Sequence, residues 1–174
     1  LLEEVDPDDW NSLFIFRLFT ALQGIVAGFW RRPSGELVEL PHRRIDLLLS
    51  VLERIPEPEK VIIWTKYRYS TEQLRAALGE AYGLEAVAEF HGGLAEGQRN
   101  QELDRWRQSA RFLVATQGVG GHGLTLNEAR HVVFYANSFK YSERLQAEDR
   151  CHRIGQERRP LYIDLDAGTG IERR

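Results

Sequence analysis

The chain has 174 residues, of which 43% are hydrophobic and 28% charged, a composition typical of a globular domain that excludes a fibre or a disordered tail. Its 23 Lys and Arg against 26 Asp and Glu give a net charge of -3, so no global positive field attracts nucleic acid or anionic membranes, and any such site must be local. The apolar runs are far shorter than the roughly 20 residues that cross a bilayer, and no signal-peptide pattern opens the chain. The single cysteine, Cys151, excludes an internal disulfide and favours a reducing, cytoplasmic setting.

The chain begins at Leu1 and contains no methionine, so we expect it to be a fragment of a longer protein. Apolar residues recur at helical spacing in two N-terminal stretches, and Pro56 and Pro58 end the second. Prolines, a serine and a glycine between the two stretches indicate a loop or a short hairpin-like crossing. The expected elements are a helix over 10–30, the crossing at 31–41 and a helix over 42–55. We therefore expect residues 1–59 to form a helical lead-in.

After residue 59, short β-branched or aromatic runs alternate with amphipathic stretches, and this alternation predicts a parallel sheet covered by helices. The expected strands cover 60–65, 85–90, 111–115, 131–135 and 161–164, and the expected helices cover 70–81, 96–107 and 142–154. Ser70 and Gln73 have the spacing of a capping box and are expected to open the first of these helices. Residues 60–174 are therefore expected to form an open, mostly parallel α/β sheet flanked by helices.

In such sheets, ligands bind at the loops that follow the carboxyl ends of the strands, and two of these loops are rich in glycine. One follows Thr116 and contains Gly120, Gly121 and Gly123, where backbone amides can approach a phosphate closely. The other is the tight exit Phe90-His91-Gly92-Gly93. Ordinary turns have the same composition, so these two loops alone do not identify a ligand.

The last predicted helix carries a group of polar side chains. Gln146, Arg150 and Arg153 stand at i, i+4 and i+7, so they share one helix face. Arginine can bind phosphate oxygens with two parallel hydrogen bonds and can stabilise the charge that develops during phosphoryl transfer. A solvated face with ion pairs to Glu148 or Asp149 has the same spacing, so spacing leaves both interpretations open.

Three segments together resemble the second lobe of Swi/Snf-type ATPases of helicase superfamily 2. They occur in that family's order over roughly residues 60–165, and the last of them is close to diagnostic. The segments are Phe90-His91-Gly92-Gly93 with Glu96-x-x-Arg99, then Leu113-Val114-Ala115-Thr116 with Gly120-Gly121-x-Gly123-Leu124-x-Leu126, then Gln146-Ala147-x-Asp149-Arg150-x-His152-Arg153-Ile154-Gly155-Gln156. The resemblance implies a RecA-like fold for residues 60–174 and makes residues 1–59 a linker from a missing first lobe.

In the family that the chain resembles, ATP lies between two lobes and double-stranded DNA lies across both. The resemblance implies that Arg150 and Arg153 are arginine fingers for ATP and that Gln146 joins them. It also implies that the loop through Gly120, Gly121 and Gly123 links the nucleotide to DNA. The residues that it assigns to the DNA phosphate backbone are Thr65, Lys66, His91, Gly92, Arg99 and Thr116.

The sequence also departs from the family pattern. It has Asn137-Ser138-Phe139-Lys140-Tyr141 where many relatives have an aromatic-Asn-Pro segment, and Thr125 where many have Asn, which is more like compact bacterial or phage-type members. No phosphate-binding Gly-x-x-x-x-Gly-Lys-Ser/Thr loop and no Asp-Glu box for magnesium occur in the chain. In the family both belong to the first lobe, so we expect ATP and Mg to be held mainly there. We expect the isolated chain to hydrolyse no ATP.

Two function classes follow. The first is the C-terminal lobe of an ATP-dependent, DNA-stimulated translocase, which the paired arginines favour, in the cytoplasm and associated with the nucleoid if the host is bacterial. The second is a non-catalytic RecA-like module that docks on DNA or on a protein. No metal site is expected, because the spacing of the histidines matches no known ligand pattern. No membrane partner is expected.

Overall fold

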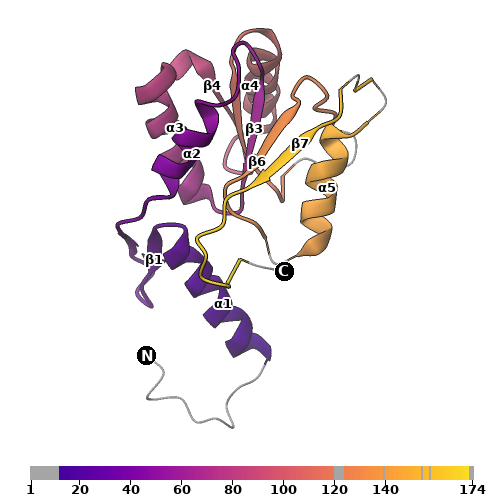
Figure 1. Cartoon of the computed structure of the whole chain (residues 1–174). Coiled ribbons are helices and arrows are strands. Elements are labelled where there is room, and N and C mark those ends of the chain that lie inside the picture. The colour runs from indigo at the N-terminus through magenta and orange to yellow at the C-terminus, as the bar shows by residue number, and fades with distance from the viewer. Residues whose placement is uncertain (1–11, 120–123, 139, 154, 157, 173–174) are drawn as a thin grey trace. The chain divides into compact units, whose positions relative to one another are not determined.

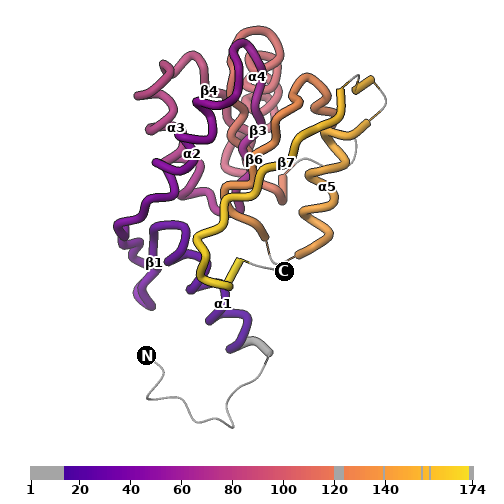
Figure 2. The backbone as a smooth tube through the Cα atoms, viewed as in Figure 1, coloured from indigo at the N-terminus to yellow at the C-terminus, as the bar shows by residue number. Residues whose placement is uncertain are grey.

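The computed structural model describes residues 12–119, 124–138, 140–153, 155–156 and 158–172 (Figure 2). The chain divides into two compact units, one of residues 1–44 and 166–174 and the other of residues 45–165. Among the described residues, no helix is both long enough and apolar enough to span a membrane.

The described residues of the first unit form one helix and one hairpin: α1 (Ser12–Val26), β1 (Phe29–Arg31) and β2 (Leu37–Glu39). The antiparallel hairpin pairs Phe29 with Glu39, which confirms the hairpin-like crossing. The prediction that the first helix reaches residue 30 is wrong. Gly28 has a φ of 90° and its amide donates to the Ile25 carbonyl at 3.0 Å, so the left-handed backbone at this glycine ends the helix before Phe29. The predicted start at residue 10 lies outside the described residues.

The second unit is an open parallel sheet of five strands in the order β4-β5-β3-β6-β7 (Figure 1). The strands are β3 (Val61–Thr65), β4 (Val87–Phe90), β5 (Phe112–Thr116), β6 (His131–Phe134) and β7 (Leu161–Asp164). All four pairings are parallel, and the register places Thr65 opposite Thr116. The five predicted strands and the α/β class are confirmed. The second strand starts later than predicted, because the 3-10 turn η2 (Leu84–Ala86) occupies its first two positions.

Helices cover both faces of the sheet (Figure 1). On one face, α4 (Glu96–Gln108) and α5 (Tyr141–Cys151) pack over Trp64, Leu113 and Phe134. On the other face, α2 (Arg44–Leu52) and α3 (Arg68–Tyr82) pack over Ile63, Val114 and Val133. Every residue of β3 and β5 is buried, as expected for central strands that are covered on both sides.

The ends of several helices differ from the sequence prediction. α2 covers Arg44–Leu52 where 42–55 was expected, and α4 ends one residue later than expected. α3 begins at Arg68 after the N-cap residue Tyr67, so Ser70 and Gln73 lie inside the helix and the predicted capping box is wrong. In the first turn of α3, the hydroxyl of Thr71 donates a hydrogen bond to the Arg68 carbonyl at 2.6 Å. α5 ends at Cys151 and not at residue 154, which itself lies outside the described residues.

Candidate functional site

The carboxyl ends of β3 and β5 lie side by side and carry two of the predicted site residues. The amide of Gln117 donates to the Thr65 carbonyl at 3.1 Å, so the chain leaves both strands at one edge of the sheet. The side chains of Thr65 and Thr116 are buried. Lys66 follows Thr65 and is half-buried over the ring of Tyr67, with its Nζ 5.1 Å from the ring centroid. Burial lowers the pKa of Lys66.

The exit from β4 is the turn that contains His91 and Gly92. His91 is buried, and its Nδ1 accepts a hydrogen bond from the Gly93 amide at 3.1 Å. Burial, and next the positive charge of Arg68, lower the pKa of His91, so the imidazole is neutral at pH 7. Arg99 of α4 closes the turn, because its guanidinium donates to the Leu94 carbonyl at 3.0 Å. The His91–Leu94 turn is therefore a fixed structure.

Gly92 is exposed and brings this turn against the start of the glycine-rich loop after β5. A methyl group at Gly92 would lie 3.3 Å from Cγ2 of Val119, so the two loop starts are in close contact. The other three predicted residues of the loop, Gly120, Gly121 and Gly123, lie outside the described residues.

Arg150 of α5 holds both ends of the glycine-rich loop. Its Nη1 donates to the Val119 carbonyl at 2.6 Å, and its own carbonyl accepts from the Leu126 amide at 2.8 Å. The side chain is 6% exposed and its guanidinium carbon lies 5.5 Å from the centroid of the Trp64 ring. Burial lowers the pKa of this guanidinium, which nevertheless stays charged at neutral pH. In this structure Arg150 is thus directed at the loop backbone.

Arg153 has the opposite environment. It lies after the end of α5, so the prediction that it shares a helix face with Gln146 and Arg150 is wrong. The side chain is exposed; its Nε donates to the Asp149 carbonyl at 3.2 Å and its Nη1 donates to the Thr125 hydroxyl at 3.4 Å. Arg153 borders a hollow of about 590 Å³, and the described residues that line it are Thr125, His152, Arg153 and Gln156.

The turn after α5 ends the helix and fixes the position of Arg153. Gly155 has a φ of 101°, a conformation that other residues rarely adopt. Nε2 of Gln156 donates to the carbonyls of Cys151, Asn127 and Ala129 at 3.3, 3.1 and 3.2 Å. The side-chain amide therefore gives the last carbonyl of α5 a hydrogen-bond partner and joins the end of the helix to the segment after the glycine-rich loop. The sequence contains Gln156 as the last residue of the arginine-containing segment, but it does not predict these three hydrogen bonds.

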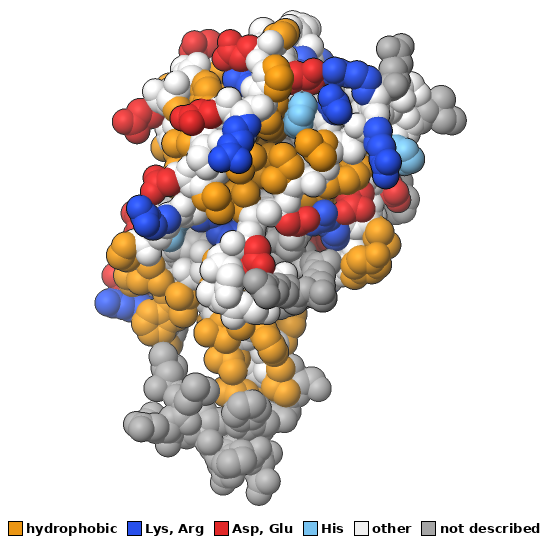
Figure 3. All heavy atoms as spheres, viewed as in Figure 1, with side chains coloured by type: hydrophobic (Ala, Val, Ile, Leu, Met, Phe, Trp, Pro, Cys, Tyr) orange, Lys and Arg blue, Asp and Glu red, His pale blue; other side chains and the backbone are white. Residues whose placement is uncertain are grey.

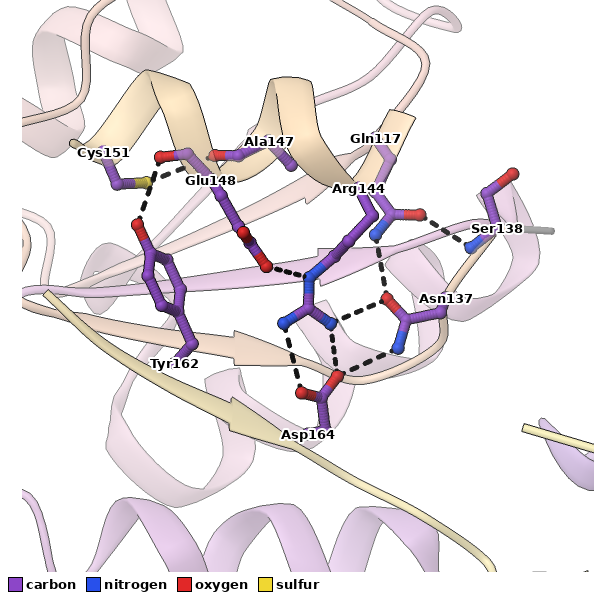
Figure 4. A network of polar contacts seen from close by, with 9 residues as sticks. All are labelled: Gln117, Asn137, Ser138, Arg144, Ala147, Glu148, Cys151, Tyr162 and Asp164. Atoms are coloured by element: carbon purple, nitrogen blue, oxygen red, sulfur yellow. Dashed lines mark hydrogen bonds and ion pairs between the residues drawn. The ribbon is translucent and has the colours of Figure 1, made fainter. Parts of the chain in front are cut away.

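Contacts therefore join Gly92, Thr116, Arg150 and Arg153 around the glycine-rich loop. Gln146 lies apart from these contacts as an exposed side chain on α5, and Arg99 is held by its own turn. A further polar network beside the loop was missed by sequence reasoning. It joins Gln117, Asn137, Arg144 and Asp164 (Figure 4). Only the pair of Arg144 and Glu148, which are four positions apart on α5, could be read from the sequence.

Among the described residues, no three His, Cys, Asp or Glu side chains are grouped as metal ligands. Of the carboxylates near the site, Glu148 and Asp164 pair with Arg144, and Glu89, which lies 3.7 Å from Nε2 of His91, pairs with Arg75. The described part of the site therefore offers cationic and amide groups for an anion and does not fit a Mg²⁺ ion.

The comparisons with known proteins concern the family and the fold of the chain. The model of the helicase conserved C-terminal domain matches residues 43–155. The ATP-dependent helicase YqhH of Bacillus subtilis is 34% identical over 111 residues, which cover 63% of this chain and 19% of that protein. The ATP-dependent DNA helicase DDM1 of Arabidopsis thaliana is 28% identical over 158 residues, which cover 88% of this chain and 20% of that protein.

A solved structure has the same fold. The crystal structure of the C-terminal part of the Fun30 ATPase domain superposes with a TM-score of 0.64 and 25% identity, over 70% of this chain and 40% of that one. The chain spans a fifth or less of the length of these two sequence relatives, both of which are named as ATP-dependent helicases.

Proposed function

Because the chain belongs to the helicase conserved C-terminal domain family and has a RecA-like fold, we propose that it is the C-terminal motor lobe of an ATP-dependent, DNA-stimulated translocase. The lobe supplies Arg153 and Arg150 to ATP bound mainly by a first lobe of the same protein, in the cytoplasm. It also holds the phosphate backbone of double-stranded DNA.

The observation that carries the proposal is the exposed guanidinium of Arg153 beside the hollow next to Thr125. An exposed arginine on a fixed turn can reach an anion from a facing surface without moving the backbone. Guanidinium groups that meet a transferring phosphoryl group stabilise its developing charge. Arg150, which bonds the Val119 carbonyl, connects this position to the glycine-rich loop and can reach the same phosphate only when that bond opens.

Several parts of the reaction must come from the first lobe. The described residues include no carboxylate cluster for Mg²⁺, and the chain has no phosphate-binding loop. The first lobe would therefore hold Mg²⁺, the triphosphate and the attacking water. Arginines that stabilise a transition state have nothing to act on without such a site, so the isolated chain would hydrolyse no ATP.

The DNA surface that we propose lies at the carboxyl edge of the sheet. Gly92 offers exposed backbone there, Lys66 is half-exposed, and Arg99 of α4 bonds the adjoining turn through the Leu94 carbonyl. The buried side chains of Thr65 and Thr116 leave mainly their backbone for contact, and His91 is neutral. The face drawn in Figure 3 mixes basic and acidic side chains and shows no broad basic patch. The contact that we propose is therefore local, and its backbone and cationic groups would bind phosphates without reading the base sequence.

The test is ATP hydrolysis by the complete gene product that carries this chain, with and without duplex DNA. We expect Arg153→Ala to lower the DNA-stimulated kcat by at least about 100-fold, because loss of an arginine finger removes charge stabilisation in the transition state. The KM for ATP and the Kd for DNA should stay within about threefold, because the triphosphate and most of the DNA are bound elsewhere.

Arg158→Ala is the matched control. It removes an exposed arginine that makes two 2.8 Å contacts with Glu59, just before β3 begins, and it should leave kcat unchanged. Equal turnover of the Arg153→Ala variant and the wild type would overturn the proposed role of Arg153. A gene product that binds DNA but hydrolyses no ATP would contradict the motor and would favour a docking module.

A further inference from the structure

Arg144 lies at the centre of a polar network that spans the carboxyl ends of three strands (Figure 4). Its side chain is 13% exposed, and its guanidinium carbon lies 3.4 Å from the centroid of the Phe134 ring. Nε donates to Glu148 at 2.5 Å, Nη2 donates to Asp164 at 3.1 Å, and Nη1 donates to Asn137 at 3.2 Å and also to Asp164. The guanidinium is therefore held on all three nitrogens.

Asn137 links Arg144 to the loop after β5. Its Oδ1 accepts from Nη1 of Arg144 and also from Nε2 of Gln117 at 3.2 Å, while its Nδ2 donates to Asp164 at 3.0 Å. The Oε1 of Gln117 in turn accepts from the Ser138 amide at 2.8 Å. Gln117 is 1% exposed, so its bond with the Ser138 amide is shielded from water.

Gln117 is the residue at which the glycine-rich loop begins. Val119, two residues later, is bonded through its carbonyl to Arg150. α5 therefore holds the start of the loop at two points, directly through Arg150 and indirectly through Arg144, Asn137 and Gln117. Two attachments to one rigid helix fix the position and the orientation of the loop start.

We propose that Arg144 is a positioning residue that holds the start of the glycine-rich loop in register with α5, the helix that carries Arg150. Its effect on ATP hydrolysis rests on the function proposed above, because it acts through Arg150 and the loop. The positioning of the loop start by Arg144 is a property of this chain and does not depend on that function. Arg144 itself contacts neither ATP nor DNA in this scheme.

The first test is hydrogen exchange of the chain carrying Arg144→Gln. Two amides report on the loop start: Ser138, which donates to Gln117, and Val119, which donates to the Thr116 carbonyl at 3.2 Å. We expect both to exchange at least about tenfold faster, because hydrogen bonds to a charged group are lost. Arg158→Gln, which removes an exposed arginine–glutamate pair at the other end of the sheet, should change them less than twofold.

A second comparison separates positioning from plain support of α5. If Arg144 acts through Gln117, the Arg144→Gln change should add little to the exchange rate of Val119 once Gln117→Ala is present. Additive effects, or faster exchange confined to α5 and β7, would overturn the inference. Asn137→Ala serves if Arg144→Gln does not fold, because it breaks the bridge and leaves the pairs of Arg144 with Glu148 and Asp164. Asn137→Ala should accelerate hydrogen exchange of the Val119 amide without accelerating the exchange of amides in α5.

The kinetic readout is the ratio of DNA-stimulated to DNA-free ATP hydrolysis by the complete gene product. This ratio does not depend on the fraction of folded protein. We expect Arg144→Gln to lower it at least about fivefold with an unchanged KM for ATP, and Arg144→Lys to recover only part, because an ammonium cannot serve three acceptors in a plane. An unchanged ratio would overturn the link to hydrolysis. A wild-type gene product without hydrolysis would refute the proposed function, while the exchange data would still decide the role of Arg144.

Discussion

At the scale of single residues, neighbouring arginines of one motif have opposite environments. Arg150 is buried against Trp64 and bonds the loop backbone, whereas Arg153 is exposed beside the hollow near Thr125. The difference arises because α5 ends at Cys151 and the chain turns before Arg153. The two arginines therefore have different tasks in this structure: one fixes the loop and the other faces outward.

The chain turns again after Arg153, at Gly155. An alanine there would keep a φ of 101° only with strain, and its Cβ would lie 2.8 Å from Nδ2 of Asn127. We predict that Gly155→Ala lowers the free energy of unfolding by about 2 kcal/mol. Gly118→Ala is the matched control, because Gly118 has no positive φ and open space around it, and it should change stability by less than about 0.5 kcal/mol. Urea unfolding of both variants measures the difference, and equal stability would contradict the strained turn.

His131 gives a prediction about pH. Its imidazole is 8% exposed, and its Nδ1 lies 3.7 Å from Oε2 of Glu59. Burial lowers the pKa of His131 in the folded chain, so below about pH 6.5 the unfolded chain binds a proton that the folded chain resists. The contribution of His131 to stability therefore falls as the pH drops from 7 towards 5.

We predict that stability falls less over this pH range in His131→Asn than in the wild type, as measured by unfolding in urea at several pH values. Above pH 5 Glu59 stays ionised in both proteins, because its hydrogen bond with Arg158 lowers its pKa. The pKa of His91 is lowered as well, so the stability of the variant still depends on pH to some extent. Identical slopes in the two proteins would contradict a titrating, buried His131.

At the scale of elements, the sequence predicted the centres of helices and strands better than their ends. The strand cores were readable because runs such as Val61-Ile62-Ile63 combine β-branched side chains with burial on both faces. Helix ends depend on distant partners. Gln156 bonds carbonyls from the 127–129 segment as well as from α5, and no local pattern encodes that contact.

The position at which α3 begins can be tested directly. Ser70 is buried inside the helix and its hydroxyl has no hydrogen-bond partner in the described structure, whereas the hydroxyl of Thr71 donates to Arg68. We predict that Ser70→Ala leaves the free energy of unfolding unchanged or raises it by up to about 1 kcal/mol, while Thr71→Val lowers it by about 1 kcal/mol. A loss of about 1 kcal/mol in Ser70→Ala would instead support the capping box.

At the scale of the whole molecule, the parallel sheet is what assembles the site. It brings the ends of β3, β4, β5 and β6 to one edge, so segments far apart in the sequence meet around the glycine-rich loop. The fold class and the arginine motif could be predicted from sequence. The network of Arg144, Asn137 and Gln117 could not, because its members come from different elements and meet only once the sheet has formed.

The central claim is that this chain completes an ATP site on a facing lobe. The most direct measurement is the distance between the Arg153 guanidinium and the γ-phosphate in a structure of the complete gene product with duplex DNA and a non-hydrolysable ATP analogue. The account predicts about 2.7–3.2 Å, the range of a charge-assisted hydrogen bond. Nucleotide bound between closed lobes with Arg153 more than about 6 Å from the γ-phosphate, well beyond hydrogen-bond reach, would contradict it.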